Sequence, residues 1–417
     1  MYSFEVKGGK KLKGEVDISG SKNASLPILA TAILNEKPVT FTNVPNIEDV
    51  NTTLKILNYL GCKVTRNCGK ITISSKNINK YEIPKSLMQK CRSTVILVGA
   101  LIARFHKAVF YFPGGCNIGK RPIDLHMKAF EKLGINIVES DSKIVCKANR
   151  INGAEIRFSF PSVGATENAI LASVFANGKT TIFNAAKEPE IIDLVNCLNK
   201  MGAKIRGAGT SKITIFGVRK FRSIVYRIMP DRIESGTFLC VSAITRNSLT
   251  INNARPRDIK SILLALKKIG CELTIKGNSI YIKPNKVQNG IDLKTLPYPG
   301  FPTDIGPIFV SLLAMANGKS TIEETIFENR FAYVEELRKM GANIRVENRT
   351  IFIEGPCKLK GKTLISKDLR GGATLVIASL SAKGKSTIEN ADYILRGYEN
   401  FEKKLNKIGG DVKLINC

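Results

Sequence analysis

The 417-residue sequence has no tryptophan, only two histidines, and 35 acidic residues against 64 lysines and arginines. It contains no run of 18 apolar residues, and its first residues carry charges where an export signal needs an apolar stretch. Its ten cysteines form no Cys-x-x-Cys pair and no Cys/His cluster of zinc spacing. These absences predict a cytoplasmic protein without a membrane span, a disulfide framework or a structural metal.

The formal charge of +29 raises the possibility of nucleic-acid binding, because basic surfaces attract phosphates. The lysines are nevertheless spread over every segment, without an arginine-rich tail, an aromatic RNA-binding motif or a zinc finger. We therefore expect small anionic partners and no specific nucleic acid. Nucleic-acid binding stays as the alternative from a different functional class.

An internal repeat of about seventy residues accounts for the whole chain. A helix-like segment that ends in an apolar residue and a glycine occurs six times, and an alternating strand follows each glycine. Glycine commonly ends helices in the left-handed conformation, so each repeat predicts a helix followed by a hairpin. The six glycines are Gly61, Gly134, Gly202, Gly270, Gly341 and Gly409.

Each repeat also contains a continuously apolar helix, as in ENAILASVFA, which predicts burial on all sides. Because a single core stops growing at roughly 250–300 residues, six repeats predict two α/β domains of three repeats each. We place these domains at 22–229 and at 230–417 plus 1–21. The sixth repeat lacks its second hairpin strand and the N-terminal FEVKGGKKLKG resembles the missing segment, so the chain should close on itself.

Charged and capping residues gather at the starts of the apolar helices. Helix N-termini bind anions, although serine and aspartate there can also be plain N-caps worth about 1 kcal/mol each. Cations at equivalent helix starts would repel one another unless they share an anion. The residues at these starts are Lys22, Asn23, Arg92, Ser162, Val163, Gly164, Asp231, Asp304, Asp368 and Arg370.

A second recurrent position is the loop before each amphipathic helix, which carries Glu188, Glu190, Arg330 and Arg396 in three of the repeats. In the second repeat this loop reads PGGCNIGKRPIDLH, and Lys120 and Arg121 would favour the thiolate of Cys116. A dyad of Cys116 with His126, or a metal at His106 or His126, remains an alternative. Loops of both domains would then form one charged cleft.

The chain closely resembles the bacterial UDP-N-acetylglucosamine enolpyruvyl transferases. The matching motifs are SGSKNASLP, PGGCNIGKRPIDLH, SVGATEN, KEPEI, MPDRIESGTF, PGFPTD, FENRF, KDLRGGATL and LRGYENFEKKL, which run from one end of the sequence to the other. The resemblance implies two domains, each an inside-out α/β barrel of three repeated units. It also implies addition of the sugar 3-hydroxyl to phosphoenolpyruvate, followed by loss of phosphate, with no metal or organic cofactor.

The resemblance assigns roles to individual residues. Lys22 would bind and polarise phosphoenolpyruvate, Arg121 and Arg396 would neutralise it, Asp304 would take the hydroxyl proton, and Cys116 would donate a proton to the methylene carbon. Asp368 would orient contacts of the closed state, Asp368 and Arg370 would both belong to the substrate-binding residues, and Cys116 would be alkylated by fosfomycin. Nucleotide-sugar binding would fall to Asn23, Arg92, Arg121, Pro122, Ile123, Asp124, Leu125, Ser162, Val163, Gly164, Asp304 and Ile326.

Two segments depart from the pattern of this family. Phe160-Pro161 stands where some members have a lysine-containing segment, and Ile305-Gly306-Pro307 replaces a glutamine-bearing run. The related shikimate 3-phosphate enolpyruvyl transferases are the nearest alternative. They lack the Gly-Gly-Cys loop, so the sequence favours a nucleotide sugar as the acceptor.

Overall fold

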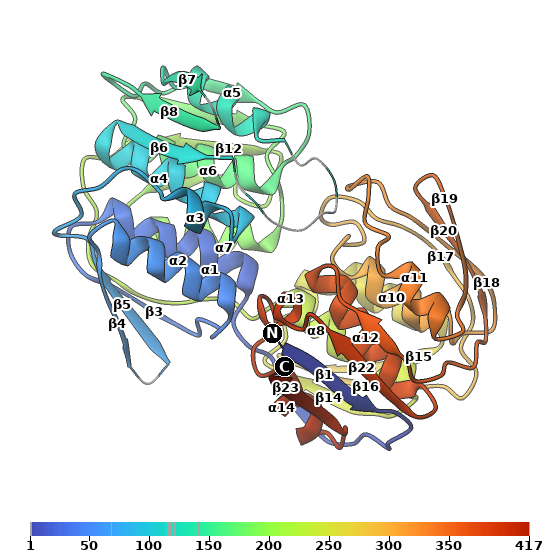
Figure 1. The fold of residues 1–417 in the computed structure, drawn as a ribbon. Coiled ribbons are helices and arrows are strands. Elements are labelled where there is room, and N and C mark those ends of the chain that lie inside the picture. Colours follow the sequence, from blue (N-terminus) through green and yellow to red (C-terminus); the bar gives the residue numbers. More distant parts are fainter. Residues whose placement is uncertain are drawn as a thin grey trace. The chain divides into compact units, whose positions relative to one another are not determined.

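The computed structural model describes residues 2–67, 69–112, 114, 119, 122–140 and 142–416. The chain forms two units (Figure 1). Of the described residues, those within 20–114 and 122–229 belong to the first unit, and those within 2–19 and 230–416, with residue 119, belong to the second. Each unit has its own hydrophobic core.

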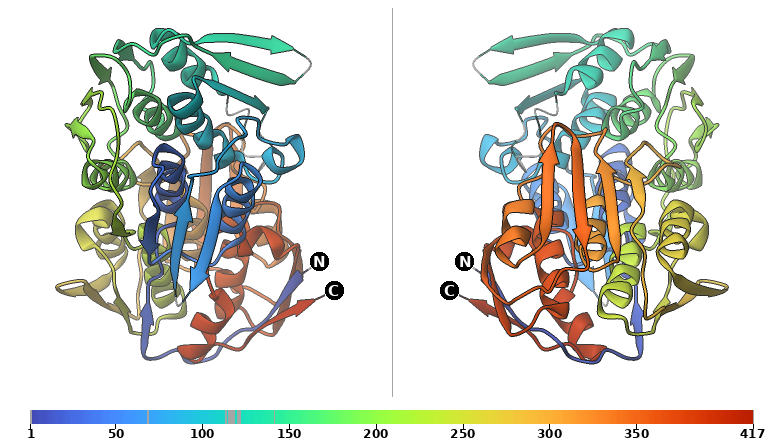
Figure 2. Two further views of the ribbon diagram at one scale, coloured as in Figure 1. Left: turned by 90° about the vertical axis from the view of Figure 1, so that its left-hand side faces the viewer. Right: turned by 90° about the vertical axis from the view of Figure 1, so that its right-hand side faces the viewer.

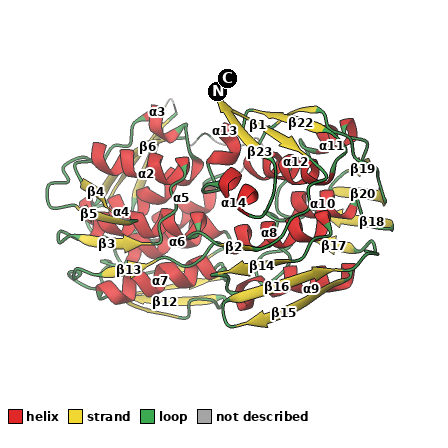
Figure 3. Cartoon of the chain, turned by 90° about the horizontal axis from the view of Figure 1, so that it is seen from below, coloured by secondary structure: helices red, strands yellow, loops and turns green. Residues whose placement is uncertain are grey.

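The core of each unit is built on three buried helices, as their continuous apolarity predicts. Several of their hydroxyl groups are accommodated by donating to carbonyls one turn back, as Thr237 Oγ1 does to Ile233 O at 2.8 Å. Figure 3 shows the buried helices of the second unit inside a rim of its strands. The buried helices are α1 (Lys22–Ala30), α4 (Ile96–Phe105) and α6 (Val163–Ser173) in the first unit, with the 3-10 turns η1 (Thr31–Leu34) and η2 (Arg92–Val95), and α8 (Arg232–Thr245), α10 (Gly306–Leu313) and α12 (Leu369–Ser381) in the second.

Amphipathic helices cover the outside, and the repeated glycine follows the main helix of each repeat. All six glycines have positive φ, between 83° and 116°, so the predicted left-handed helix ends are confirmed. The outer helices are α2 (Glu48–Tyr59), α3 (Lys85–Met88), α5 (Asp124–Lys132), α7 (Pro189–Met201), η3 (Pro256–Ile259), α9 (Lys260–Ile269), α11 (Val334–Lys339), α13 (Asp392–Leu395) and α14 (Phe401–Lys407). No helix of the described residues has both the length and the apolar character that crossing a membrane requires.

The hairpins form the outer sheets. In the first unit the sheets are β13–β3–β5–β4, β6–β8–β7 and β11–β12–β10–β9. Their strands are β3 (Val39–Thr42), β4 (Lys63–Asn67), β5 (Lys70–Ser74), β6 (Lys107–Tyr111), β7 (Asn136–Ser140), β8 (Lys143–Lys147), β9 (Glu155–Arg157), β10 (Lys179–Phe183), β11 (Lys204–Arg206), β12 (Lys212–Phe216) and β13 (Val225–Arg227).

In the second unit the sheets are β21–β22–β1–β23, β15–β16–β14–β2 and β17–β18–β20–β19. Their strands are β1 (Tyr2–Lys7), β2 (Glu15–Asp17), β14 (Leu249–Asn252), β15 (Cys271–Lys276), β16 (Ser279–Pro284), β17 (Asp292–Lys294), β18 (Gly318–Glu323), β19 (Asn343–Glu347), β20 (Thr350–Gly355), β21 (Thr363–Ile365), β22 (Lys385–Glu389) and β23 (Val412–Asn416). Each of these sheets joins one short parallel strand to an antiparallel group.

The predicted closure of the chain is confirmed. Strand β1 lies between β22 and β23, with Phe4 opposite both Ile388 and Leu414, and the two ends of the chain lie side by side (Figure 2). The chain passes from one unit to the other after Ser19 and again after Met229. A buried carboxylate of the same unit holds the backbone just before each passage, since Glu234 accepts from Ser19 N at 2.8 Å and Asp193 accepts from Met229 N at 3.0 Å.

Candidate active site

The starts of four buried helices are capped by side chains. Ser21 and Ser162 accept from the amides of Ala24 and Ala165 at 3.2 and 3.4 Å. Asp231 accepts at 2.8 and 3.0 Å from two amides of α8, and Asp368 accepts at 3.0 and 2.9 Å from Arg370 N and Gly371 N of α12. The alternative that such residues are N-caps therefore holds for these four side chains.

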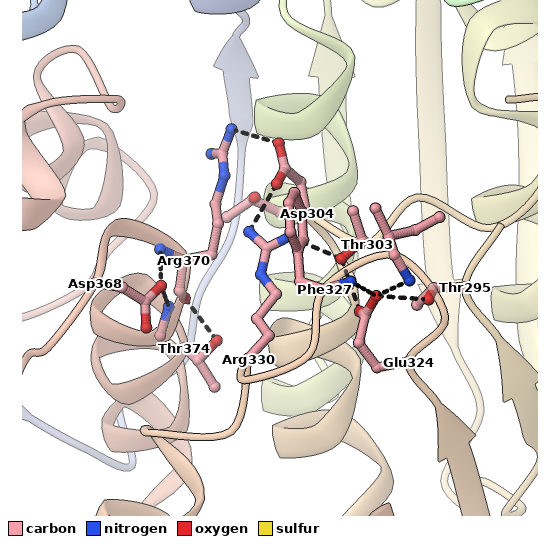
Figure 4. A network of polar contacts seen from close by, with 12 residues as sticks. Thr295, Thr303, Asp304, Glu324, Phe327, Arg330, Asp368, Arg370 and Thr374 are labelled. Atoms are coloured by element: carbon pink, nitrogen blue, oxygen red, sulfur yellow. Dashed lines mark hydrogen bonds and ion pairs between the residues drawn. The ribbon is translucent and has the colours of Figure 1, made fainter. Parts of the chain in front are cut away.

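Asp304, at the equivalent helix start of the fifth repeat, is different. Helix α10 has no side-chain cap, and the Asp304 carboxylate instead lies between two arginines (Figure 4). Its Oδ1 is 2.7 Å from Arg330 Nη2 and its Oδ2 is 3.4 Å from Arg370 Nη2. Both arginine side chains are 4% exposed and the Asp304 side chain is 27% exposed, so this carboxylate remains open to solvent. Such an arrangement can accept a proton and also attract an anion.

The side chain of Glu324 fixes the backbone of the loop that carries Ile326. The buried Glu324 carboxylate accepts from Ile326 N at 2.8 Å and from Phe327 N at 3.1 Å. It also accepts from the hydroxyls of Thr295 and Thr303 at 3.0 and 2.7 Å (Figure 4). Glu324 could not be recognised from the sequence, because a glutamate in a polar loop carries no signal of burial.

Lys22 begins α1 and forms an ion pair that the sequence does not reveal. Its Nζ lies 2.9 Å from Asp49 Oδ2, and the two side chains are 15% and 3% exposed. Asp49 lies in the first turn of α2, where an acidic residue favours the helix dipole, so its sequence position suggested only local stabilisation. The pair holds the lysine ammonium group at the helix start.

His126 is a buried, neutral side chain. Asn168 Oδ1 accepts from Gly99 N at 2.8 Å, which orients the amide so that its Nδ2 donates to Val95 O at 3.0 Å and to His126 Nδ1 at 2.8 Å. The imidazole proton is therefore on Nε2. Burial, assisted by the charge of Arg92, lowers the pKa of His126 to about 4. Its Nδ1 is thus engaged within the fold and not available to a metal.

Residues 122–125 and 162–164 approach each other around His126. A Cβ on Gly164 would lie 3.2 Å from His126 Cε1, so any larger residue here would require the imidazole to shift by a few tenths of an ångström. Pro122 and Asp124 are exposed, with Asp124 3.7 Å from Lys128, while Ile123 is buried and Leu125 and Val163 are partly buried.

Of the remaining predicted site residues, three are among the described residues and three are not. Asn23 is the second residue of α1, Arg92 begins η2, and Arg396 follows α13, each partly buried. Cys116, Lys120 and Arg121 lie outside the described residues. Seven of the described cysteines are free, six of them buried, and the described residues contain no group of three or more metal-binding side chains.

The two units of helices inside sheets define the fold of an enolpyruvyl transferase. The crystal structure of the enolpyruvyl transferase NikO from Streptomyces tendae matches with a TM-score of 0.90, over 100% of this chain and 99% of that chain, at 23% identity. The predicted fold class is thereby confirmed.

The family can be stated more closely. The chain belongs to the EPSP synthase (3-phosphoshikimate 1-carboxyvinyltransferase) family, whose model matches residues 6–405. It is 50% identical to UDP-N-acetylglucosamine 1-carboxyvinyltransferase 2 of Caldanaerobacter subterraneus subsp. tengcongensis, over 100% of both chains. It is 44% identical to UDP-N-acetylglucosamine 1-carboxyvinyltransferase 1 of Carboxydothermus hydrogenoformans, over 100% of this chain and 99% of that one.

Proposed function

We propose that this protein transfers the enolpyruvyl group of phosphoenolpyruvate to the 3-hydroxyl of UDP-N-acetylglucosamine. The full-length identity of 50% to a relative with that activity in its name carries the proposal. The reaction releases phosphate and is the first committed step of peptidoglycan synthesis. Both substrates are small cytoplasmic anions, so we infer that the protein acts in the cytoplasm on small molecules.

The addition step needs a base for the hydroxyl and cations for phosphoenolpyruvate. Asp304 is a solvent-accessible carboxylate held in a fixed orientation, and it would take the hydroxyl proton as the oxygen attacks C2. Lys22 would bind the phosphoenolpyruvate phosphate, exchanging part of its pairing with Asp49 for the ligand. A proton delivered to C3, for which Cys116 is the proposed donor, completes the tetrahedral intermediate.

The elimination step reverses the proton transfer at C3 and breaks the bond between C2 and the phosphate oxygen. Charge grows on the departing phosphate, so cations already in place lower the barrier. We assign this role to Lys22, Arg121 and Arg396, and the positioning of Asp304 to Arg330 and Arg370. Ser162 and Asp368, whose side chains cap α6 and α12, are assigned to substrate binding with them.

We assign sugar-nucleotide binding to residues near the starts of the buried helices and to the loop that carries Ile326. Asn23, Arg92, the 122–125 segment, the 162–164 segment and Ile326 would contribute to it. The Ile326 amide already donates to Glu324, so that contact fixes the loop that we expect the substrate to meet.

The test is phosphate release from phosphoenolpyruvate with either UDP-N-acetylglucosamine or shikimate 3-phosphate as the acceptor. The shikimate substrate is included because the matching family model carries that activity in its description. We expect release with the nucleotide sugar alone. Release only with shikimate 3-phosphate would overturn the proposal, and DNA binding without any phosphate release would favour the nucleic-acid alternative.

A further inference from the structure

A basic pocket lies in the second unit at the ends of its buried helices. Its volume is about 680 Å³, within the range of small-molecule sites. The apolar side chains of Ile244, Met315 and Leu380, at or just beyond the C-terminal ends of α8, α10 and α12, line it. Asp231, Asp304 and Asp368 lie at the opposite, N-terminal ends of these helices. The 14 residues of α8 put about 20 Å between the two ends.

Three equivalent loops, one from each repeat of the unit, bring lysines to this pocket. The loops correspond because each uses the same backbone contact to the end of an outer helix. Lys13 N donates to Ile408 O at 2.8 Å, Asn289 N to Ile269 O at 2.9 Å, and Lys360 N to Met340 O at 2.8 Å. The lysines lie two or three residues before these donors and are Lys11, Lys286 and Lys358.

The electrostatic balance of the pocket favours an anion. Lys10 and Arg246 add to the three lysines, and no acidic residue is among the described residues that line the pocket. Each of the three helix C-termini carries a partial negative charge of about half a unit, so together they offset only part of these five positive charges. Arg246 Nη2 donates to Met315 O at 3.4 Å, and Lys10 lies 4.0 Å from Asp411. After the helix dipoles and Asp411 are counted, more than two positive charges remain. Capping of the helix carbonyls alone does not require so many cations.

We propose that this pocket binds a small soluble polyphosphate, a ligand with two or more adjacent phosphate groups. The three lysines come from three separate loops, so a ligand with several linked phosphates can contact more than one loop at once. The apolar floor of Ile244, Met315 and Leu380 can additionally contact a nucleobase. A second anion site would give a function to some of the many lysines that the transferase reaction does not require.

The test compares binding of inorganic tripolyphosphate, by calorimetry at low salt, to three full-length proteins. These are the wild type, a pocket variant with Lys286→Ala and Lys358→Ala, and a control with Lys267→Ala and Lys276→Ala. The control removes the same charge from exposed positions of the same unit outside the pocket. All three proteins keep the candidate active site, so ligand bound there contributes equally to each.

We expect the pocket variant to lose about tenfold in affinity, because each of two solvent-exposed charge pairs contributes about threefold, and the control to bind like the wild type. ATP should bind at the same pocket, and more tightly than tripolyphosphate if its base meets the apolar floor. Equal binding by the two variants would overturn the proposal, as would the lack of saturable binding by the wild type. Phosphate-release activity of all three proteins, measured separately, keeps this result distinct from the proposed function.

Discussion

Arg330 holds the Asp304 carboxylate through a contact of 2.7 Å between Nη2 and Oδ1, with its own side chain only 4% exposed. Arg330 also donates to Thr303 Oγ1 at 2.8 Å, so the guanidinium orientation is set by two neighbouring residues. Arg370 meets the second carboxylate oxygen at 3.4 Å. The fold therefore presents one carboxylate in a defined orientation, which is the requirement for a general base.

We predict that Asp304→Asn lowers kcat by about 100-fold or more, the usual contribution of a positioned acid or base. The change keeps the size of the side chain but removes its proton affinity. Steady-state phosphate release measures the effect. The control is Asp292→Asn in β17 of the same unit, whose exposed side chain accepts from Thr321 N and Oγ1 through Oδ1 and keeps that acceptor as asparagine. Similar losses of kcat in both variants would contradict a special role for Asp304.

The ion pair between Lys22 and Asp49 gives a prediction that separates binding from folding. Lys22→Ala should raise the KM for phosphoenolpyruvate and lower stability by about 1–3 kcal/mol, because the Asp49 side chain is 3% exposed and would lose the nearby ammonium group. Adding Asp49→Ala should restore much of the stability without restoring the KM. Denaturant unfolding and steady-state kinetics measure the two effects. A double variant that regains both would show that Lys22 has a structural role only.

The sequence predicted the arrangement of elements well because the repeat carries its own signals. Apolar runs such as the one in α6 predict burial, and the glycine at the end of each helix has no alternative residue that fits so readily. The partners within the site were not predictable in the same way. Asp49 and Glu324 look like ordinary surface acids in sequence, and only the packing of α1 against α2 and of the 324–330 loop shows that they are buried. Asp231, Asp304 and Asp368 read alike, and the structure distinguishes the caps from the carboxylate that meets two arginines.

Glu324 is predicted to be a positioning residue for the loop that carries Ile326. Glu324→Ala would leave two backbone amides and two hydroxyls without their acceptor, at a cost of about 3 kcal/mol or more, and should raise the KM for the nucleotide sugar. Glu324→Gln keeps one acceptor oxygen and should recover most of the KM. An unchanged KM in a folded Glu324→Ala protein would contradict this role.

Cys116 is predicted to be the thiol that fosfomycin alkylates. Burial raises the pKa of Cys146 and of Cys271 to about 12, so these thiols are protonated at neutral pH and react slowly. Mass spectrometry of the treated protein should place the adduct on the peptide that contains Cys116, and Cys116→Ala should abolish labelling. Labelling of Cys116→Ala at another cysteine would identify a different reactive thiol.

His126 should make the stability of the protein depend on pH. Its pKa is about 4 in the folded state and about 6.5 when unfolded, so only the unfolded chain binds the extra proton between these values. Stability should fall by about 3 kcal/mol as the pH drops from 6.5 to 4, with no contribution from this residue above 6.5. His126→Gln, which keeps an acceptor for Asn168, should lack this part of the loss. Because the chain has only two histidines, proton NMR can follow both rings directly, with His106→Gln assigning the signals. A His126 signal that titrates near pH 6.5 would show that the ring is not held neutral by burial.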